Sequence, residues 1–278
     1  MKRVLSIQDI SCLGKCSLTV ALPIISAMGI ETSIIPTAVL STHTQFNGYT
    51  FRDLTGDMIP IKEHWKKEGF HFDAIYTGYL GSKEQIQIVS DFFDTFRNEK
   101  SYMIVDPAMA DNGKMYSGFQ PDFALEMAKL CKKADIILPN ISEACFLLGR
   151  DYPGEDANRE EIKDLLLGLA ELGAKKVVIT GVRFPENGFG FMGYDTQTGN
   201  FFEYTTEEIA MKSHGTGDVF ASTFTGALLN DFSVFDALKI AADYTCACIK
   251  NTYHDPNAVN YGVNFESEIP YLLKLIGK

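Results

Sequence analysis

The sequence has 278 residues, of which 46% are hydrophobic and 22% are charged, and its formal net charge is -11. The composition is that of a folded globular protein. The acidic charge and the lack of a basic stripe exclude nucleic acid and acidic membrane surfaces as expected partners. No apolar run approaches the length that spans a membrane.

Short apolar runs alternate with longer amphipathic segments along the chain. We predict strands at 4–7, 33–39, 74–77, 102–105, 136–138 and 176–180. We predict helices at 17–28, 83–97, 121–132, 141–148, 162–172, 219–229 and 237–252, with a further polar helical stretch that ends at Gly69. This alternation predicts an α/β fold with a mostly parallel sheet covered by helices on both faces. Because no repeat or linker interrupts it, we expect one domain over 1–278.

The six cysteines form no Cys-x-x-Cys pair and stand near no histidine cluster, so the sequence does not favour a zinc site. The apolar stretch at 4–7 is too short for the hydrophobic region of a secretion signal. We therefore expect free thiols and a cytoplasmic protein.

Polar residues directly follow the predicted strands. They are Gln8 and Asp9, residues 41–47, Gly78 and Tyr79, residues 106–111, residues 140–143, and Thr180 with Gly181. In open α/β sheets the ligand crevice lies at the carboxyl ends of the strands. The sequence therefore predicts a binding site at this edge of the sheet.

The glycine loop before the helix predicted at 219–229 carries the most specific signal. Gly215, Thr216 and Gly217 allow successive backbone N–H groups to converge on an anion, and the helix dipole adds positive charge. Asp218 would then lie beside a phosphate, where a carboxylate makes sense as the base that takes a proton from an attacking alcohol. The alternative is an ordinary helix start in which Asp218 only stabilises the first turn.

Three acids follow predicted strands and suit a magnesium–nucleotide site, namely Asp106, Asp111 and Glu143. Magnesium takes oxygen ligands, often with waters and substrate phosphates. The alternative is structural, with Asp106 capping a turn and Glu143 opening a helix. His43 and Tyr79 stand in polar loops, where they either lie in solvent or stack on a flat substrate ring.

One misleading motif and two missing motifs argue against three common classes of enzyme. Residues 188–193 match the letters of a dinucleotide fingerprint, but they lead into a predicted β-hairpin with a turn near Gly199 rather than into a helix. The chain has no P-loop, because Gly14-Lys15 is followed by Cys16. It also lacks the Gly-x-Ser-x-Gly element of α/β-hydrolases.

Five segments together carry a family resemblance. Gly215-Thr216-Gly217-Asp218 resembles the C-terminal signature of the ribokinase-like kinases. Ile7-Gln8 and residues 41–46, 77–82 and 106–111 resemble the pyridoxal kinases, and the likeness runs from residue 4 to about residue 250. It implies a three-layer α/β/α fold with a central, mostly parallel sheet. It also implies a homodimer that uses ATP and Mg²⁺, often with K⁺, to phosphorylate the 5′-hydroxymethyl group of pyridoxal, pyridoxamine or pyridoxine.

The resemblance also implies residue roles. Asp218 would be the base, and Gly215, Thr216 and Gly217 the anion hole. Asp106 and Glu143 would organise the metal together with Asp111, while Asp111, Tyr116, Asn140 and Thr180 would serve the nucleotide. Asp9, His43, Thr44 and Tyr79 would surround the substrate ring. Asp9 is a departure, because the family usually has Ser there, and its carboxylate would accept a hydrogen bond from a pyridinium N–H or pair with the amine of pyridoxamine.

Two alternatives to a vitamin B6 kinase stay open from the sequence. The first is a kinase for hydroxymethylpyrimidine or another small alcohol on the same fold, since hydroxymethylpyrimidine is also flat. The second is a non-catalytic protein that binds B6 or a nucleotide, although the Gly-Thr-Gly-Asp element argues against it.

Overall fold

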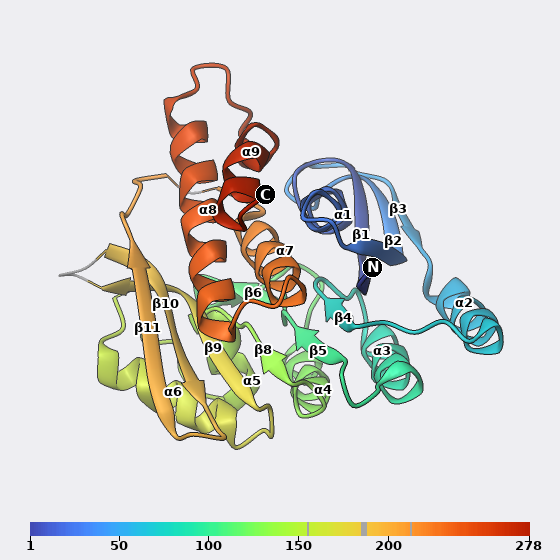
Figure 1. The fold of residues 1–278 in the computed structure, drawn as a ribbon. Coiled ribbons are helices and arrows are strands. Elements are labelled where there is room, and N and C mark those ends of the chain that lie inside the picture. The colour runs from blue at the N-terminus through green and yellow to red at the C-terminus, as the bar shows by residue number, and fades with distance from the viewer. Residues whose placement is uncertain (155, 185–187, 212) are drawn as a thin grey trace. The chain divides into compact units, whose positions relative to one another are not determined.

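The computed structural model in Figure 1 describes residues 1–154, 156–184, 188–211 and 213–278. The chain divides into two compact units. Unit 1 comprises Met1–Tyr76 and Glu208–Lys278, and unit 2 comprises Thr77–Glu207. Unit 1 is therefore built from the two ends of the chain, and unit 2 from one continuous middle segment.

Unit 1 combines strands of the central sheet with helices from both ends of the chain. Its strands are β1 (Arg3–Leu13), β2 (Glu31–Thr42), β3 (Phe51–Asp53) and most of β4 (Ala74–Thr77), in the order β4-β1-β2-β3. Its helices are α1 (Leu18–Ala27), α2 (Thr55–Glu68), α7 (Thr216–Leu229), α8 (Val234–His254) and α9 (Phe265–Leu275). β1 and β2 are parallel, whereas β3 pairs antiparallel with β2 at its edge.

The helices of unit 1 bury the apolar strand β1 and one another. α1 contacts β1, β2 and α7, α7 contacts α8, and α8 contacts α9. Val4, Leu5 and Ile7 of β1 are fully buried, as are Val219 and Phe224 of α7. This packing fixes the start of α7, where Asp218 lies, relative to the loop between β1 and α1.

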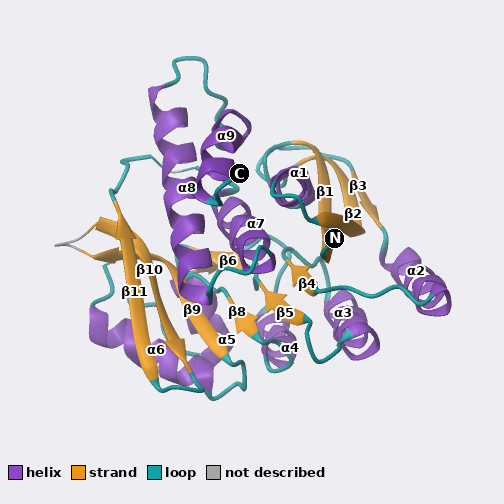
Figure 2. Cartoon of the chain, viewed as in Figure 1, coloured by secondary structure: helices purple, strands orange, loops and turns teal. Residues whose placement is uncertain are grey.

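Unit 2 contains the remaining strands and helices, which Figure 2 colours by type. Its main strands are β5 (Tyr102–Val105), β8 (Ile136–Ile137), β9 (Lys176–Phe184), β10 (Gly188–Asp195) and β11 (Asn200–Thr206), in the order β11-β10-β9-β8-β5. A separate small hairpin joins β6 (Ala110–Asp111) to β7 (Lys114–Met115). Its helices are α3 (Lys83–Phe96), α4 (Pro121–Cys131), α5 (Ile141–Leu148) and α6 (Arg159–Ala170).

The strand directions confirm the predicted α/β class with a mostly parallel sheet and flanking helices. β5, β8 and β9 are parallel, and β10 and β11 add antiparallel strands at the edge. The hairpin predicted after the glycines at 188–193 is β10–β11. There a Cβ on Gly190 would lie 2.0 Å from the carbonyl oxygen of Tyr204, and one on Gly193 would lie 2.3 Å from the ring of Phe202. Close strand packing therefore accounts for these two glycines.

Several predicted element bounds are wrong. β1 continues to Leu13, so Gln8 and Asp9 lie inside the strand rather than after it, and Thr180 lies inside β9. Gln8 and Asp9 are buried with hydroxyl partners, since the amide of Gln8 donates to Ser6 Oγ at 2.9 Å and Ser11 Oγ donates to Asp9 at 3.2 Å. The sequence pattern also missed β3, the β6–β7 hairpin and α9.

No helix in the part of the chain that the structure describes is long and apolar enough to cross a membrane.

Candidate functional site

Asp9 lies at an irregularity of the β1–β2 pair. Gln8 is opposite Pro36 and Ile10 is opposite Val39, so two β2 residues stand across from Asp9 alone. A bulge of this kind redirects side chains and is frequent beside active sites. Asp9 is 4% exposed, and burial of its carboxyl group raises its pKa against the opposing effect of hydrogen bonds from Ser17 and Ser11.

The loop between β1 and α1 ends at Ser17, the residue that begins the helix. The Ser17 carbonyl accepts from Val20 and Ala21, yet its side chain makes no capping bond to the helix. Its backbone has a positive φ of 51°, which is uncommon for a residue with a side chain. Hydrogen bonding by its side chain lowers the pKa of Asp9, and hydrogen bonding by its backbone lowers the pKa of Asp218.

The glycine loop begins α7 in the way that the sequence predicts. Gly215 is the residue before the first turn and has a φ of 75°, while Thr216 and Gly217 are the first helical residues. A Cβ on Gly215 would lie 1.9 Å from the carbonyl oxygen of Lys15. Only glycine therefore allows the loop after β1 to approach the start of α7 this closely. First-turn amides have no carbonyl partner within their helix and are available to an anion.

Asp218 lies in the first turn of α7, beside the loop after β1. Burial of its carboxyl group is the main cause that raises its pKa to about 7, and the charge of Asp9 raises it further, whereas the Ser17 backbone hydrogen bond lowers it. Cys16 lies in the same environment, because burial and the charges of Asp218 and Asp9 raise its thiol pKa to about 12. A carboxyl with a pKa near neutrality is suited to accept a proton from an alcohol.

His43 and its aromatic neighbours form a second feature of unit 1. The His43 ring stacks on that of His214 with centroids 5.9 Å apart, and it meets Phe46 edge-on at 5.0 Å. His43 is buried, and its Nε2 has no hydrogen-bond partner among the described residues. Burial and His214 lower its pKa, so the ring is neutral near pH 7. Thr44 is exposed in the turn that follows.

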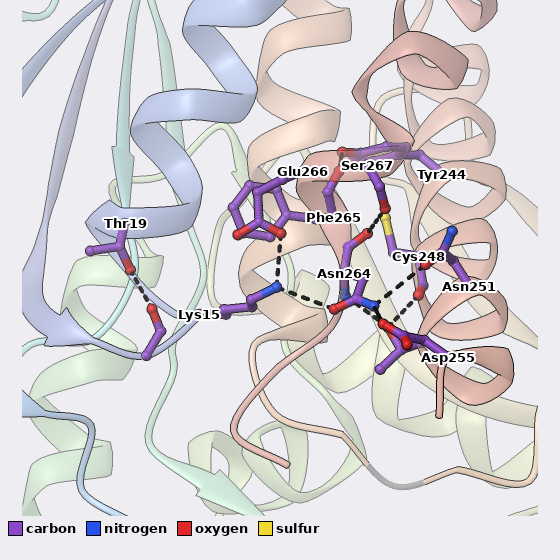
Figure 3. A network of polar contacts seen from close by, with 12 residues as sticks. Lys15, Thr19, Tyr244, Cys248, Asn251, Asp255, Asn264, Phe265, Glu266 and Ser267 are labelled. Atoms are coloured by element: carbon purple, nitrogen blue, oxygen red, sulfur yellow. Dashed lines mark hydrogen bonds and ion pairs between the residues drawn. The ribbon is translucent and has the colours of Figure 1, made fainter. Parts of the chain in front are cut away.

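Lys15 connects the loop after β1 to the segment that begins α9. Its ammonium donates to Glu266 at 2.8 Å and to Asn264 at 3.3 Å, and it lies 5.8 Å from the centre of the Phe265 ring. Figure 3 shows these contacts continuing through Asn264, whose side chain donates to Asp255 at 2.9 Å. The loop that touches Gly215 is therefore anchored by an ion pair and a hydrogen bond.

In unit 2, Asp106 directly follows β5, and Asp111 is the last residue of β6. Asp106 is 8% exposed, and its amide donates to the carbonyl of Thr77 at 3.0 Å. Asp111 is exposed, and its carboxylate accepts from the backbone and side chain of Asn112. Tyr116 follows the hairpin with 39% of its surface exposed, and its amide donates to Met109 at 2.8 Å.

The hairpin is attached to the start of α5 through Asn140 and Glu143. The Asn140 side chain donates to the Ala110 carbonyl at 2.8 Å and accepts from the Glu143 amide at 2.9 Å. The buried carboxylate of Glu143 accepts from the amides of Met109 at 3.1 Å and Asn140 at 2.9 Å. Burial raises the Glu143 pKa to about 7 against the effect of these hydrogen bonds. Glu143 thus organises the loop after β5, a role that the sequence signalled only as a helix start.

Thr180 and Tyr79 are the remaining predicted residues of unit 2. Thr180 forms a bridge with Asn140, and its amide donates to the Pro139 carbonyl at 2.9 Å, which brings two predicted nucleotide residues together. Tyr79 stacks on Phe119 with centroids 5.5 Å apart, and Phe119 stacks on Phe123 at 4.0 Å.

Two expectations concern metals and thiols. Over the described ranges, no three His, Cys, Asp or Glu side chains gather closely enough to hold a metal ion by themselves. A magnesium ion on Asp106 or Glu143 would therefore depend on waters and phosphates for its other ligands, as this ion commonly does. The six cysteines are free, as the sequence predicts.

The structure adds three residues that sequence reasoning missed. Ser17 begins α1 with a positive φ, Lys15 anchors the loop after β1, and His214 stacks on His43. A positive φ at a serine leaves no trace in the sequence, and the partners of Lys15 lie about 250 positions further on. The only feature of the sequence that points to His214 is its position directly before Gly215.

The chain matches one protein-family model over residues 22–264, described as phosphomethylpyrimidine kinase. It is 27% identical to the hydroxymethylpyrimidine/phosphomethylpyrimidine kinase of Aquifex aeolicus over 196 residues, covering 69% of this chain and 73% of the relative.

Two solved structures are similar over nearly the whole chain. One is a Bacteroides thetaiotaomicron protein described as a candidate phosphomethylpyrimidine kinase, in a crystal form with pyridoxal. It has a TM-score of 0.92 and 39% identity, with 98% of this chain and 95% of that chain covered. The other is pyridoxal kinase from Lactobacillus plantarum, with a TM-score of 0.91 and 28% identity, covering 99% of this chain and 98% of that chain.

Proposed function

Because the chain belongs to the phosphomethylpyrimidine kinase family and is thereby a phosphotransferase, we propose that it phosphorylates the 5′-hydroxymethyl group of a vitamin B6 vitamer with ATP. The observation that carries this proposal is the position of Asp218 in the first turn of α7, with a pKa raised to about 7. The 39% identity to a protein crystallised with pyridoxal supports the choice of substrate.

Unit 1 would bind and activate the alcohol. Asp218 accepts the proton of the 5′-hydroxyl group as its oxygen attacks the γ-phosphorus, and the bond from that phosphorus to the bridging oxygen of ADP breaks. The amides of Gly215, Thr216 and Gly217 stabilise the charge on the transferred group. His43 offers a buried, neutral ring to the polar edge of the vitamer, and its Nε2 has no hydrogen-bond partner among the described residues. Asp9 stays a predicted substrate residue.

Unit 2 would bind the nucleotide. The segments that carry the four predicted nucleotide residues are connected, because Asn140 bonds Ala110 and pairs with Thr180. These residues are Asp111, Tyr116, Asn140 and Thr180. Asp106 and Glu143 would serve Mg²⁺, which neutralises phosphate charge when bound. Glu143 fits best as an indirect ligand, since its oxygens already accept two backbone amides. A single kinase domain, a homodimer, a role for K⁺ and a cytoplasmic location stay predictions.

Hydroxymethylpyrimidine is a second candidate substrate. The family model and the relative in Aquifex aeolicus both carry the name of pyrimidine kinases. The pyrimidine is flat and carries a hydroxymethyl group, so the stacked rings around His43 would accept it as well.

Initial rates with ATP and Mg²⁺ test the proposal and separate the candidates. We expect kcat/KM for at least one of pyridoxal, pyridoxamine and pyridoxine to exceed that for hydroxymethylpyrimidine by about 10-fold or more, which corresponds to about 1.4 kcal/mol of selective binding. Phosphorylated product is measured directly, with the same reactions lacking Mg²⁺ as the control. Turnover of hydroxymethylpyrimidine alone would replace the proposal by its alternative, and vitamer binding without turnover would refute catalysis.

A further inference from the structure

The β6–β7 hairpin of unit 2 turns at Asn112 and Gly113. These two residues have φ angles of 50° and 71°, both in the left-handed region. Consecutive residues with positive φ, and the pair Asn-Gly in particular, are typical of the tight type I′ turn that closes a β-hairpin. A two-stranded hairpin is only marginally stable by itself in water. The order of this hairpin therefore depends on the residues to which it is attached.

Ser142 and Tyr152 hold the tip of the hairpin from outside it. The Gly113 amide donates to the hydroxyl oxygen of Ser142 at 2.8 Å. Ser142 lies in the first turn of α5, and only 3% of its surface is exposed. A Cβ on Gly113 would lie 2.5 Å from Cδ1 of Tyr152, so the Tyr152 ring packs directly against the turn. The tip is thus attached to α5 and to the segment that follows this helix.

The base of the hairpin is attached to the same helix. The Asn140 side chain donates to the Ala110 carbonyl at 2.8 Å, and the Glu143 carboxylate accepts from the Met109 amide at 3.1 Å. Ser142 lies between Asn140 and Glu143 in the sequence. Since base and tip are bonded to one helix end, the hairpin cannot move relative to α5 without breaking these hydrogen bonds.

The part of the hairpin that would meet a nucleotide is exposed. Asp111 and Tyr116, two of the predicted nucleotide residues, are exposed to solvent. The Tyr116 amide donates to the Met109 carbonyl at 2.8 Å, so Tyr116 is tied to the base of the hairpin. The attached tip and base therefore determine where these two side chains stand, although Ser142 and Tyr152 are not themselves among the predicted nucleotide residues.

We propose that Ser142 and Tyr152 are positioning residues that hold the β6–β7 hairpin in its nucleotide-binding shape before the nucleotide arrives. The attachment is independent of the substrate, and only its effect on ATP rests on the proposed function. A loop that is already ordered loses less conformational entropy on binding, so its ligand binds more tightly. If only about a tenth of the molecules held the competent shape, the apparent affinity would fall about 10-fold.

Hydrogen exchange without any ligand tests the attachment. In Ser142→Ala the Gly113 amide loses its acceptor, so the amides of residues 109–116 should exchange about 10-fold faster than in the wild type. Ser101→Ala is the matched control, because Ser101 is a buried serine of unit 2 whose hydroxyl accepts from the Asn98 amide at 2.9 Å, before β5. It should leave the exchange of residues 109–116 unchanged. Equal exchange of the hairpin in Ser142→Ala and the wild type would overturn the proposal.

A double-mutant cycle tests the contact between Gly113 and Tyr152. Gly113→Ala places a Cβ against the ring and should speed the exchange of the hairpin. In a Tyr152→Ala background the ring is absent, so the further effect of Gly113→Ala should be smaller by about 3-fold or more. Gly118→Ala is the control, because Gly118 has a φ of 92° but a Cβ there meets no atom within 4 Å. Its effect should be the same in both backgrounds. Equal effects of Gly113→Ala in the two backgrounds would overturn the role of Tyr152.

Kinetics test whether the attached hairpin serves ATP. In Ser142→Ala we expect the KM for ATP to rise by about 5–10-fold, while kcat and the KM for the vitamer stay within about 2-fold. A merely structural role would change the KM values of both substrates alike. Ser101→Ala should keep all three parameters within about 2-fold of the wild type. An unchanged KM for ATP in Ser142→Ala, with faster exchange of the hairpin, would overturn the proposal.

Nucleotide binding separates this proposal from the proposed function. A wild type that turned over no vitamer would refute the proposed function alone, and calorimetric titration with ADP would then take the place of the kinetics. The Kd of Ser142→Ala for ADP should exceed that of the wild type by about 5–10-fold. Equal Kd values would overturn the positioning role of Ser142.

Discussion

Gly215→Ala is the substitution whose effect the structure fixes most closely. Alanine pays roughly 1–2 kcal/mol for the left-handed conformation that Gly215 adopts, at a φ of 75°. The new Cβ would also lie 1.9 Å from the Lys15 carbonyl oxygen, so the loop after β1 must move by more than an ångström. We expect a total loss of about 2–4 kcal/mol of unfolding free energy, together with a fall in kcat of about 10-fold or more, because Asp218 and Ser17 are displaced.

Gly217→Ala provides the matched control for this experiment. Gly217 lies two residues further on, in the first turn of α7, and a Cβ there meets no atom within 4 Å. Since alanine is the better helix former by about 1 kcal/mol, this variant should be as stable as the wild type or more so. Urea unfolding midpoints measure both variants. Equal stability of Gly215→Ala and Gly217→Ala would refute the close approach of the two loops.

Three further substitutions test other parts of the two units. Lys15→Met keeps the aliphatic stem but removes the bonds to Glu266 and Asn264. In urea titrations at low salt it should lower the unfolding free energy by about 0.5–1 kcal/mol. The loss should be smaller in 1 M NaCl, because salt screens the ion pair. Glu143→Ala leaves the amides of Met109 and Asn140 unpaired, so it should lower the unfolding free energy by about 1–3 kcal/mol in the same assay. A loss under about 0.5 kcal/mol would contradict the structural role of Glu143. His43→Phe keeps the stacked ring but lacks Nε2. The KM for the vitamer should therefore rise by about 10-fold, with Tm nearly unchanged. An unaltered KM would show that Nε2 does not bind the substrate.

The sequence predicts the sheet because its central strands are short, apolar and β-branched. The runs at 74–77 and 102–105 match β4 and β5 without change, and burial of every residue except Tyr102 explains their largely apolar character. α9 contains Pro270, and proline ordinarily argues against a helix interior, but α1 and α2 were predicted although they contain Pro23 and Pro60. β1 was predicted too short, since Gln8 and Asp9 resemble loop residues until their hydroxyl partners are known.

The candidate site is predictable where a local motif determines it. The glycine loop and Asp218 are adjacent in sequence, so their arrangement at the start of α7 follows from helix geometry. Ser17, Lys15 and His214 depend on contacts between distant segments or on an unusual backbone angle, and no local pattern encodes these. For Glu143 the sequence predicts a helix start, and the structure adds the capping box with Asn140 and the bond from the Met109 amide.

The most direct test of the account compares wild type and Asp218→Asn over pH 5.5–9 with the best vitamer, ATP and Mg²⁺. General base action is typically worth about 10²–10⁴-fold. We predict that Asp218→Asn lowers kcat by about 100-fold or more and changes KM by less than about 3-fold. We also predict that the wild-type kcat/KM falls below a midpoint near pH 7, where the carboxyl takes up its proton, and that the variant loses this dependence. Turnover of Asp218→Asn near the wild-type rate, with the same midpoint, would contradict the assignment of Asp218 as the base.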